Sequence, residues 1–431
     1  MQTALSDLCS EPSSRTGSQA GSELLAPLDA SRDALLMPGA ESTAADASAR
    51  FPARERPPLA LLGIPFDNVT MSEALASLER MIESRCPHFV TTANVDFLTL
   101  ARADAELRDA LLEAHLVIGD GMPVIWASRL LGNPLPERVA GADLVPRLLV
   151  RAAQRGYRLF FLGASEEANE RAVANARARF PGVSIVGNYS PPLCPLAEMN
   201  DHEIIRRVRD ANPDVLLVAF GCPKAEKWMA RRYRELGVPV LIGVGGTLDF
   251  LAGRMRRAPG WMQRSGLEWL FRLGQEPKRL LGRYARDLCC FAPWLARQCW
   301  RTGLWAGARR SRAGRWTITG SGAWWHVHAP ERLDFAAVAS SRSFWHHPGC
   351  THCVMDLGRT RFMDSTGLAL LLRLRRQCRL AGGELVLVSP RPFVARLLKA
   401  MRLEDCFLTV WGRAAAGRAG DLHAMPTGAL P

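Results

Sequence analysis

The chain has 431 residues, of which 48% are hydrophobic, so it is long enough for two hydrophobic cores joined by linkers. Its eleven cysteines are odd in number and irregularly spaced, which argues against a secreted disulfide framework and favours a reducing cytoplasm. No run reaches about 18 uninterrupted apolar residues, and the N-terminus lacks the pattern of a signal peptide. We therefore expect a protein that stays inside the cell and does not span a membrane.

Residues 1–57 are rich in serine, alanine and proline without a sustained apolar period, and we expect a disordered leader. From residue 58 to 253 short apolar strands alternate with amphipathic helices, which predicts an α/β core. The predicted strands include HFVTTAN, YRLFFLG, DVLLVAFG and VPVLIGVGG, and the predicted helices include LRDALLEA and ANERAVANARARF. Strands that are apolar throughout indicate a parallel sheet covered by helices on both faces.

The net charge of +13 is concentrated in one segment that follows this core. Between Arg254 and Arg315 there are 15 arginines and lysines against three acids, and five tryptophans lie among them. Basic groups mixed with aromatic residues suit helices that lie on an anionic membrane surface. An ordinary solvated helix is the alternative, and nucleic acid is disfavoured because no nucleic-acid-binding motif accompanies the charge. We expect residues 254–310 to form a helical appendage and linker that associates with a membrane.

A second α/β pattern follows a linker rich in glycine, arginine and serine and extends over residues 315–412. Its predicted strands are WTITG, HCVMDLG and ELVLVSP, and its predicted helices are GLALLLRLRRQCRLAGG and PFVARLLKAMRL. Residues 413–431 resemble a flexible polar tail. The chain therefore divides into two α/β domains separated by the basic segment.

The first candidate for chemistry is Asp120, in the sequence LVIGDG. Ligands bind at the carboxyl ends of the strands in parallel α/β sheets. Asp120 follows an apolar strand and precedes a glycine, so its carboxylate could act there as a general base on a hydroxyl group. A simple turn explains an isolated Asp-Gly equally well.

Other strand ends carry groups suited to a nucleotide diphosphate. The chain has no D-x-D pair, the usual metal ligand of sugar-nucleotide enzymes, so cations and backbone amides would have to bind the diphosphate. Arg138 is one candidate, although a surface arginine is the alternative. Glycine-rich or charged strand ends supply the rest, each of which could also be a structural turn or a solvated helix start: Gly163, Gly221, Lys224, Glu226, Lys227, Gly245, Gly246 and Asp249.

Five blocks resemble, in order, the WecG/TagA/CpsF family of bacterial glycosyltransferases. They are TTANVDFL, LVIGDGMPVIWASRLLGNPLPERVAGADL, LFFLGAS, VAFGCPKAEKW and GVGGTLDFLAGRMRRAPGWMQRSGLEWLFRLGQEPKRL, within about residues 59–284. The resemblance implies a Rossmann-like core. It also implies metal-independent, inverting transfer from a UDP-sugar to an undecaprenyl-diphosphate-linked sugar in exopolysaccharide, capsule or other surface-glycan assembly. The expected location is the inner face of the cytoplasmic membrane, where the protein would be peripheral.

The resemblance also assigns roles to residues. It makes Asp120 the catalytic base and Thr92 a second catalytic residue, and it makes Asn94 and Arg138 contacts to the substrate. Gly121 is a further expected contact, because it leaves the backbone open to ligand. The arginines of the appendage that would reach the diphosphate are Arg264, Arg272 and Arg279. One position departs from the family pattern P-K-Q-E-K-W, because this chain has Ala225 where the family has glutamine. The lost amide would alter donor preference or rate.

The second domain resembles a STAS domain, the fold of anti-sigma factor antagonists. The resemblance lies in CVMDLGRTRFMDSTG and the helix that follows, and it makes Ser365 the phosphoacceptor. A hydroxyl at a helix N-terminus is expected to be exposed, and a phosphate there would meet free amides and the helix dipole. The alternative is that Ser365 or Asp364 only caps the helix. The implied partner is a STAS-binding protein or a kinase.

A few further alternatives remain. The cluster WHHPGCTHC could bind zinc, but Cys353 lies in a predicted strand and no distant ligand pair completes a site, so we expect neither metal nor cofactor. An impaired transferase core, with the chain acting mainly as a STAS-based scaffold, is the main rival function. A NAD-dependent enzyme lacks its glycine fingerprint here. A homo-oligomer stays open.

Overall fold

The computed structural model describes residues 56–302, 315–321, 324–341 and 351–411. These all lie within one compact unit, Ser42–Pro431. The predicted leader of residues 1–57, except its last two residues, and the tail of residues 413–431 lie outside the described residues.

The first domain is built on a six-stranded sheet with the strand order β4-β3-β8-β7-β5-β6. Every pair of neighbouring strands is parallel. The strands are β3 (His88–Ala93), β4 (Leu116–Gly119), β5 (Arg158–Gly163), β6 (Ser184–Tyr189), β7 (Val215–Ala219) and β8 (Val240–Gly243). The predicted parallel sheet is confirmed, and all carboxyl ends therefore meet at one edge.

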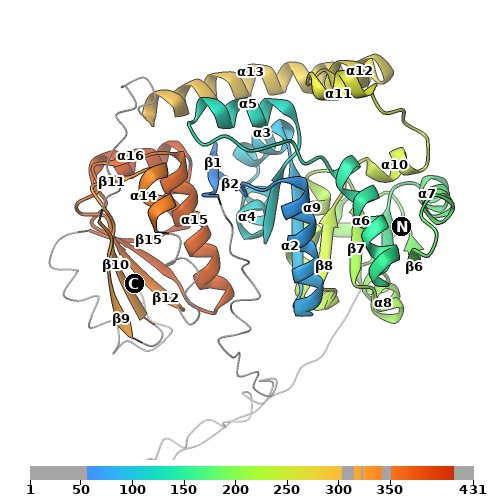
Figure 1. Cartoon of the computed structure of the whole chain (residues 1–431), viewed down its shortest axis with the longest axis horizontal. Coiled ribbons are helices and arrows are strands. Elements are labelled where there is room, and N and C mark those ends of the chain that lie inside the picture. Colours follow the sequence, from blue (N-terminus) through green and yellow to red (C-terminus); the bar gives the residue numbers. More distant parts are fainter. Residues whose placement is uncertain (1–55, 303–314, 322–323, 342–350, 412–431) are drawn as a thin grey trace, which may run out of the picture. The chain divides into compact units, whose positions relative to one another are not determined.

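Helices cover both faces of this sheet (Figure 1). They are α2 (Met71–Ser84), α3 (Val95–Ala103), α4 (Ala105–Glu113), α5 (Met122–Leu130), α6 (Gly141–Arg155), α7 (Glu166–Arg179), α8 (Asp201–Ala211), α9 (Lys224–Leu236) and α10 (Thr247–Leu251), with the short η1 (Leu196–Glu198) before α8. Neighbouring residues of one strand join different cores: Phe89 packs in a cluster with residues of α4 and α9, and Val90 packs in a cluster with residues of α2 and α6. This alternation explains why the strands are apolar throughout.

A short antiparallel hairpin precedes the sheet and was not predicted from the sequence. It consists of β1 (Leu59–Leu61) and β2 (Ile64–Phe66). Its residues are buried, and β1 packs on helix α15 (Ser365–Leu380) of the second domain. The hairpin therefore lies in the core and not in a linker.

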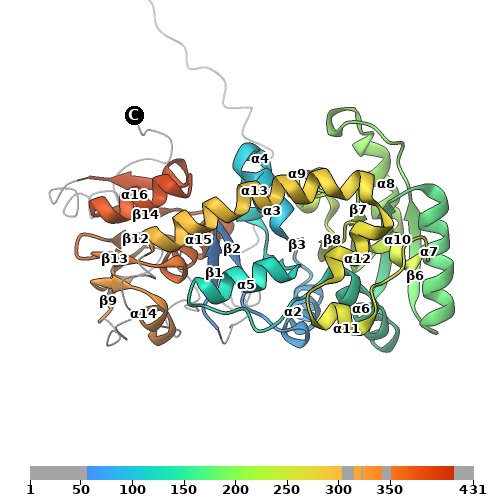
Figure 2. The same ribbon diagram turned by 90° about the horizontal axis from the view of Figure 1, so that it is seen from above.

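The basic segment is helical, as predicted. It forms α11 (Gly260–Arg264), α12 (Glu268–Gln275) and the long α13 (Pro277–Arg301), which packs along α3 (Figure 2). Its exposed apolar side chains include Trp261, Leu281, Leu288 and Trp300. No helix in the described part of the chain is both long and apolar enough to cross a bilayer.

The second domain has a five-stranded sheet with the order β15-β14-β12-β10-β9. The elements are β9 (Thr317–Ser321), β10 (Trp324–His328), β12 (His352–Asp356), β14 (Leu385–Val388) and β15 (Leu408–Val410), a small pair of β11 (Arg332–Leu333) and β13 (Phe362–Met363), and α14 (Phe335–Ser340), α15, α16 (Pro392–Ala400) and η2 (Glu404–Cys406). The predicted strands and helices of this domain are confirmed. Strands β10 and β15 were not predicted.

The cluster considered for zinc is only partly described. His346, His347 and Cys350 lie outside the described residues, whereas Cys353 is buried in β12 and His352 stacks on Trp324 with 4.4 Å between ring centroids. In the described ranges no group of three or more His, Cys, Asp or Glu side chains could hold a metal ion.

Candidate active site

Asp120 lies directly after β4, at the carboxyl edge of the sheet. Its backbone N–H donates to the carbonyl of Ala93 in β3 at 2.8 Å, which holds the two strand ends together. The next residue, Gly121, has φ +121 and begins the connection into α5. Since this backbone conformation disfavours side chains, glycine is needed here. The Asp-Gly is therefore a connection from strand to helix that leaves the partly buried carboxylate at the ligand-binding edge.

Thr92 and Asn94 come from the end of the adjacent strand β3. The Thr92 hydroxyl is buried and donates to the carbonyl of Gly243, the last residue of β8, at 3.1 Å. Asn94 caps α3 by accepting a hydrogen bond from the backbone N–H of Asp96 at 3.0 Å. An added Cβ on Gly121 would lie 3.7 Å from the Cβ of Asn94, so these two positions face each other. The structure thus brings Thr92, Asn94, Asp120 and Gly121 together.

Arg138 belongs to a closed ring of two arginines and two carboxylates. Its Nη2 lies 3.0 Å from Oδ2 of Asp143, and its Nη1 lies 2.5 Å from Oε2 of Glu268. Arg257 pairs with the other oxygen of each acid, binding Oδ1 of Asp143 and lying 3.3 Å from Oε1 of Glu268. Each carboxylate therefore bridges both guanidinium groups. We call these four residues the ion-pair ring.

The electrostatic surroundings of Asp120 suit a base that works near neutral pH. Burial raises the pKa of Asp120 from 3.8 to about 6, because the charged carboxylate loses hydration. The positive charges of Arg138 and Arg272 oppose this rise, and the negative charges of Glu268 and Asp143 add to it. A carboxylate with this pKa is ionised at pH 7 and yet basic enough to accept a proton from a hydroxyl that is being activated.

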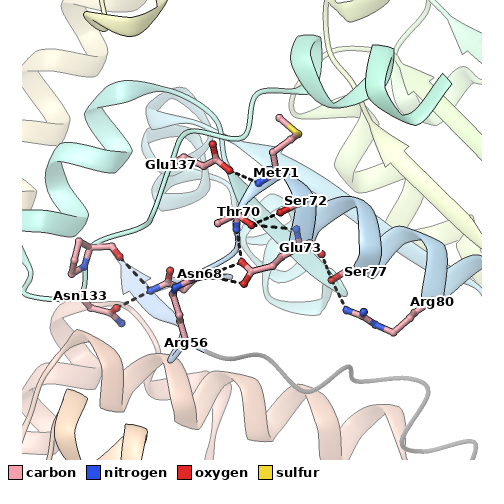
Figure 3. Close-up of polar contacts among 11 residues, drawn as sticks. Arg56, Asn68, Thr70, Met71, Ser72, Glu73, Ser77, Arg80, Asn133 and Glu137 are labelled. Carbon is pink, nitrogen blue, oxygen red and sulfur yellow. Dashed lines mark hydrogen bonds and ion pairs between the residues drawn. The ribbon is translucent and has the colours of Figure 1, made fainter. Parts of the chain in front are cut away.

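The loop that carries Arg138 is held from its other side (Figure 3). The carboxylate of Glu137 accepts a hydrogen bond from the backbone N–H of Met71 at 2.6 Å, at the start of α2. Asn68 donates its side-chain amide to Oδ1 of Asn133 at 2.9 Å. Glu137 thus fastens the loop to α2, and the next residue, Arg138, fastens it to the ion-pair ring.

The start of α2, to which the loop is bonded, is itself fixed by a helix cap. Thr70 accepts from the backbone N–H of Glu73, and the Glu73 carboxylate accepts from the backbone N–H of Thr70, a complete capping box. Arg56 adds an ion pair to Glu73 at 2.7 Å (Figure 3).

The glycines at the other strand ends serve different purposes. Gly163 ends β5 with φ +98, and a Cβ there would lie 2.8 Å from the backbone of Ala219 in β7, so close strand packing explains this glycine. Gly221 has φ +76 with open space around it. Gly245 and Gly246 are exposed after β8, and Asp249 follows in the short helix α10. The exposed pair leaves room for a ligand to approach the backbone.

The segment PKAEKW contributes less to the site surface than the sequence suggests. The ammonium group of Lys224 donates to the carbonyl of Cys194 at 2.6 Å, and that of Lys227 lies 2.5 Å from Asp104, which joins α9 to α4. Ala225 is buried in the core cluster. Glu226 is 2% exposed, and burial raises its pKa to about 7. These contacts pair both lysines with other groups of the protein.

The appendage places one of its predicted arginines near the base. Arg272 lies over the ring of Phe250 at 5.6 Å, and its charge acts on Asp120. The side chains of Arg264 and Arg279 lie outside the described part of the structure. Sequence reasoning missed Asp143, Arg257 and Glu268, which lie within the quoted blocks but carry no spacing signal of their own.

The expected exposure of Ser365 is wrong. Ser365 is 1% exposed, and its hydroxyl accepts a hydrogen bond from the side chain of Gln298 in α13 at 2.9 Å. Asp364 caps α15 by accepting from the backbone N–H groups of Thr366 and Gly367. The serine is buried because α15 packs on the β1–β2 hairpin and the Gln298 side chain of α13 lies against its first residue.

Comparison with known proteins gives matches to both domains. The model of the glycosyl transferase WecG/TagA/CpsF family matches residues 59–304, and that of the STAS domain matches residues 311–414. The chain is 28% identical over 222 residues to N-acetylglucosaminyldiphosphoundecaprenol N-acetyl-beta-D-mannosaminyltransferase of Staphylococcus aureus strains MW2 and MRSA252. Each alignment covers 51% of this chain and 85% of the relative.

Among solved structures, the anti-sigma factor antagonist SpoIIAA in its unphosphorylated form is 20% identical, with a TM-score of 0.22, over 25% of this chain and 97% of SpoIIAA. Its phosphorylated form, from Bacillus, has a TM-score of 0.21. The first family model covers more than half of the chain and includes the strand ends around Asp120. The chain therefore belongs to the WecG/TagA/CpsF family of glycosyltransferases and carries a C-terminal STAS domain.

Proposed function

We propose that this protein transfers a hexosyl or N-acetylhexosaminyl group from a UDP-sugar to a sugar linked to undecaprenyl diphosphate. The observation that carries the proposal is the position of Asp120. It is a partly buried carboxylate at the carboxyl edge of a parallel sheet, with a pKa of about 6 and arginine charges beside it. That arrangement suits a base next to a binding place for an anionic donor.

The reaction we propose is a single displacement. Asp120 takes the proton from an acceptor hydroxyl, the oxygen forms a bond to the anomeric carbon of the donor, and the bond from that carbon to UDP breaks. The configuration at the anomeric carbon is then inverted. Arg138 and Arg272, whose positive charges act on Asp120, are the cations that we propose stabilise the departing diphosphate. With these cations available and no D-x-D pair, the proposed reaction needs no metal ion.

The relatives support the class of acceptor. The Staphylococcus aureus proteins are named for transfer of N-acetyl-D-mannosamine to N-acetylglucosaminyl-diphosphoundecaprenol. We propose an acceptor of the same kind here, a lipid-diphosphate-linked amino sugar used in surface-glycan assembly. The donor stays open among UDP-N-acetylhexosamines and UDP-hexoses, since Ala225 replaces the glutamine of the family motif.

We further propose that the protein acts as a peripheral protein at the inner face of the cytoplasmic membrane. Because the lipid part of the proposed acceptor lies in the bilayer, the protein has to bind it at the membrane surface. The helices α11 to α13 combine excess positive charge with exposed Trp261, Trp269, Trp300, Leu281 and Leu288. Aromatic and aliphatic side chains in a basic setting are suited to the interface of an anionic bilayer. The STAS domain would then serve protein interaction or regulation.

The experiment that tests the transfer uses the purified full-length chain in detergent or vesicles. It is given UDP-N-acetylmannosamine, UDP-N-acetylglucosamine or UDP-glucose together with N-acetylglucosaminyl-diphosphoundecaprenol, and the lipid product is measured by mass spectrometry. One donor should give a product larger by one sugar, with UDP released in equal amount and with no loss of rate in EDTA. The proposal is overturned if no donor gives product or if Asp120→Asn supports the same rate as the unaltered chain.

A further inference from the structure

The ion-pair ring joins segments that are far apart in the chain. Arg138 lies in the loop after α5, Asp143 in the first turn of α6, Arg257 in the connection from α10 to α11, and Glu268 at the first residue of α12. Two of these residues belong to the core and two to the basic segment. The ring is therefore a direct ionic connection between the appendage and the edge of the sheet that carries Asp120.

Within the ring, Glu268 is the residue that ties α12 to the core. Its side chain is 12% exposed, and each of its oxygens faces a different arginine, Arg138 at 2.5 Å and Arg257 at 3.3 Å. An acid at the first residue of a helix is also favoured by the helix dipole. This geometry fixes both the position of the first turn of α12 and its rotation.

The rotation of α12 decides where Arg272 lies, because residues four apart share one face of a helix. Arg272 and Arg257 both lie over the ring of Phe250, at 5.6 and 5.5 Å from its centroid. The Nε of Arg272 is buried and has no hydrogen-bond partner within the described residues. Arg272 thus owes its place beside Asp120 to packing and to the anchoring of its helix.

We propose that Glu268 is a positioning residue for sugar transfer: by binding Arg138 and Arg257 it docks α12 on the core and so places the Arg272 guanidinium beside Asp120. This inference rests on the proposed function for its kinetic consequences only. The docking itself concerns the free protein. Glu268 touches neither donor nor acceptor in this role, and it acts through Arg272.

The test uses the full-length chain with Glu268→Ala, Glu268→Asp, Arg272→Gln and the double variant Glu268→Ala/Arg272→Gln. Glu203→Ala is the matched control, because Glu203 also pairs with two arginines, Arg206 and Arg207, but on the exposed face of α8. Circular dichroism and thermal unfolding first establish that each variant is folded. The measurements are the turnover number across pH 5 to pH 9 and the rate of tryptic cleavage in the connection before α11.

Turnover by Glu268→Ala should fall on the order of 10-fold to 100-fold, which is the effect of misplacing a group in an active site. Cleavage after Arg256 should become faster, and Glu268→Asp should recover part of both losses. Arg272→Gln alone should move the acid limb of the pH profile to higher pH, because Asp120 then loses a positive neighbour, with Arg138, Asp143 and Glu268 still facing it. In the Glu268→Ala background the same Arg272→Gln change should move the limb no further.

Two results would overturn the inference. One is an equal shift of the acid limb by Arg272→Gln in both backgrounds, which would mean that Arg272 keeps its place without Glu268. The other is a cleavage rate of Glu268→Ala equal to that of Glu203→Ala. If the unaltered chain transfers no sugar at all, the proposed function fails, but the cleavage measurement still decides whether Glu268 docks the appendage.

Discussion

Replacing Asp120 by asparagine should abolish transfer and at the same time stabilise the protein. Asparagine keeps the shape of the side chain but cannot accept a proton, so the turnover number should fall by about 10²-fold to 10⁴-fold. The stabilisation follows from the pKa, which burial raises from 3.8 to about 6. The charged form of Asp120 therefore destabilises the folded protein relative to the unfolded chain.

The size and pH dependence of this gain follow from the same pKa. Because the pKa of Asp120 is higher in the folded protein than in the unfolded chain, its ionisation lowers the free energy of unfolding. This loss is absent below about pH 4, grows between pH 4 and pH 6, and is complete above pH 6. At about 1.4 kcal/mol for each pH unit, the full cost is up to about 3 kcal/mol, and about half of it is present at pH 5. Partial solvent contact of the carboxylate makes this an upper bound.

The assay is thermal unfolding of the full-length chain and of Asp120→Asn at pH 5 and pH 8. One kcal/mol corresponds to about 2–4 °C for domains of this size, so the variant should melt several degrees higher at pH 8 and less so at pH 5. Asp210→Asn, an exposed aspartate on α8, is the control and should show no such pH-dependent gain. The reasoning is refuted if Asp120→Asn has the same melting difference at both pH values, or if it retains near-normal turnover.

Other variants test separate parts of the structure. Gly163→Ala should lower the unfolding free energy by about 1–3 kcal/mol in denaturant melts, because φ is +98 and the new Cβ would meet the β7 backbone. Gly156→Ala, at φ +74 in open space, should cost only about 1 kcal/mol, and equal losses would refute the packing argument. Leu288→Ser should weaken sedimentation with anionic vesicles, whereas Leu193→Ser, at an even more exposed leucine on the loop before α8, should not. Gln298→Ala should lower stability by about 1–3 kcal/mol, because it leaves buried hydrogen-bonding groups of the β1–β2 hairpin and Ser365 without partners, and an unchanged melting temperature would contradict this.

Much of the fold could be predicted from local patterns. The strands of the first sheet are apolar on both faces, and this composition, together with the intervening amphipathic helices, predicted a parallel sheet covered on both faces. The order of the strands in the sheet came only from the structure. Strand β10, with the sequence WWHVH, was missed because two tryptophans and two histidines give no clear alternation of apolar and polar residues. The hairpin of β1 and β2 was missed because each strand has only three residues.

The candidate site divides in the same way. Thr92 lies near the end of β3, and Asn94 and Asp120 each follow a strand, so the rule for parallel sheets was enough to bring them to one edge. Lys224 and Lys227 also follow a strand end, yet their ammonium groups bind Cys194 and Asp104, and no local signal distinguishes them from ligand-binding lysines. The direction of a long side chain depends on which partner lies within its reach, and that is a property of the folded chain.

The sequence by itself determined the two-domain organisation, the parallel sheet, the basic helical segment and the position of Asp120 directly after a strand. Each of these depends on the order of residue types along a short stretch of chain. Only the tertiary structure decided that Arg138 is held between Asp143 and Glu268, that Ser365 is buried against Gln298 of α13, and that Asp120 has a pKa of about 6. Arg138 and Glu268, like Asp120 and Arg272, are more than a hundred residues apart in the sequence. Their charges act on each other only once the chain has folded and brought them close.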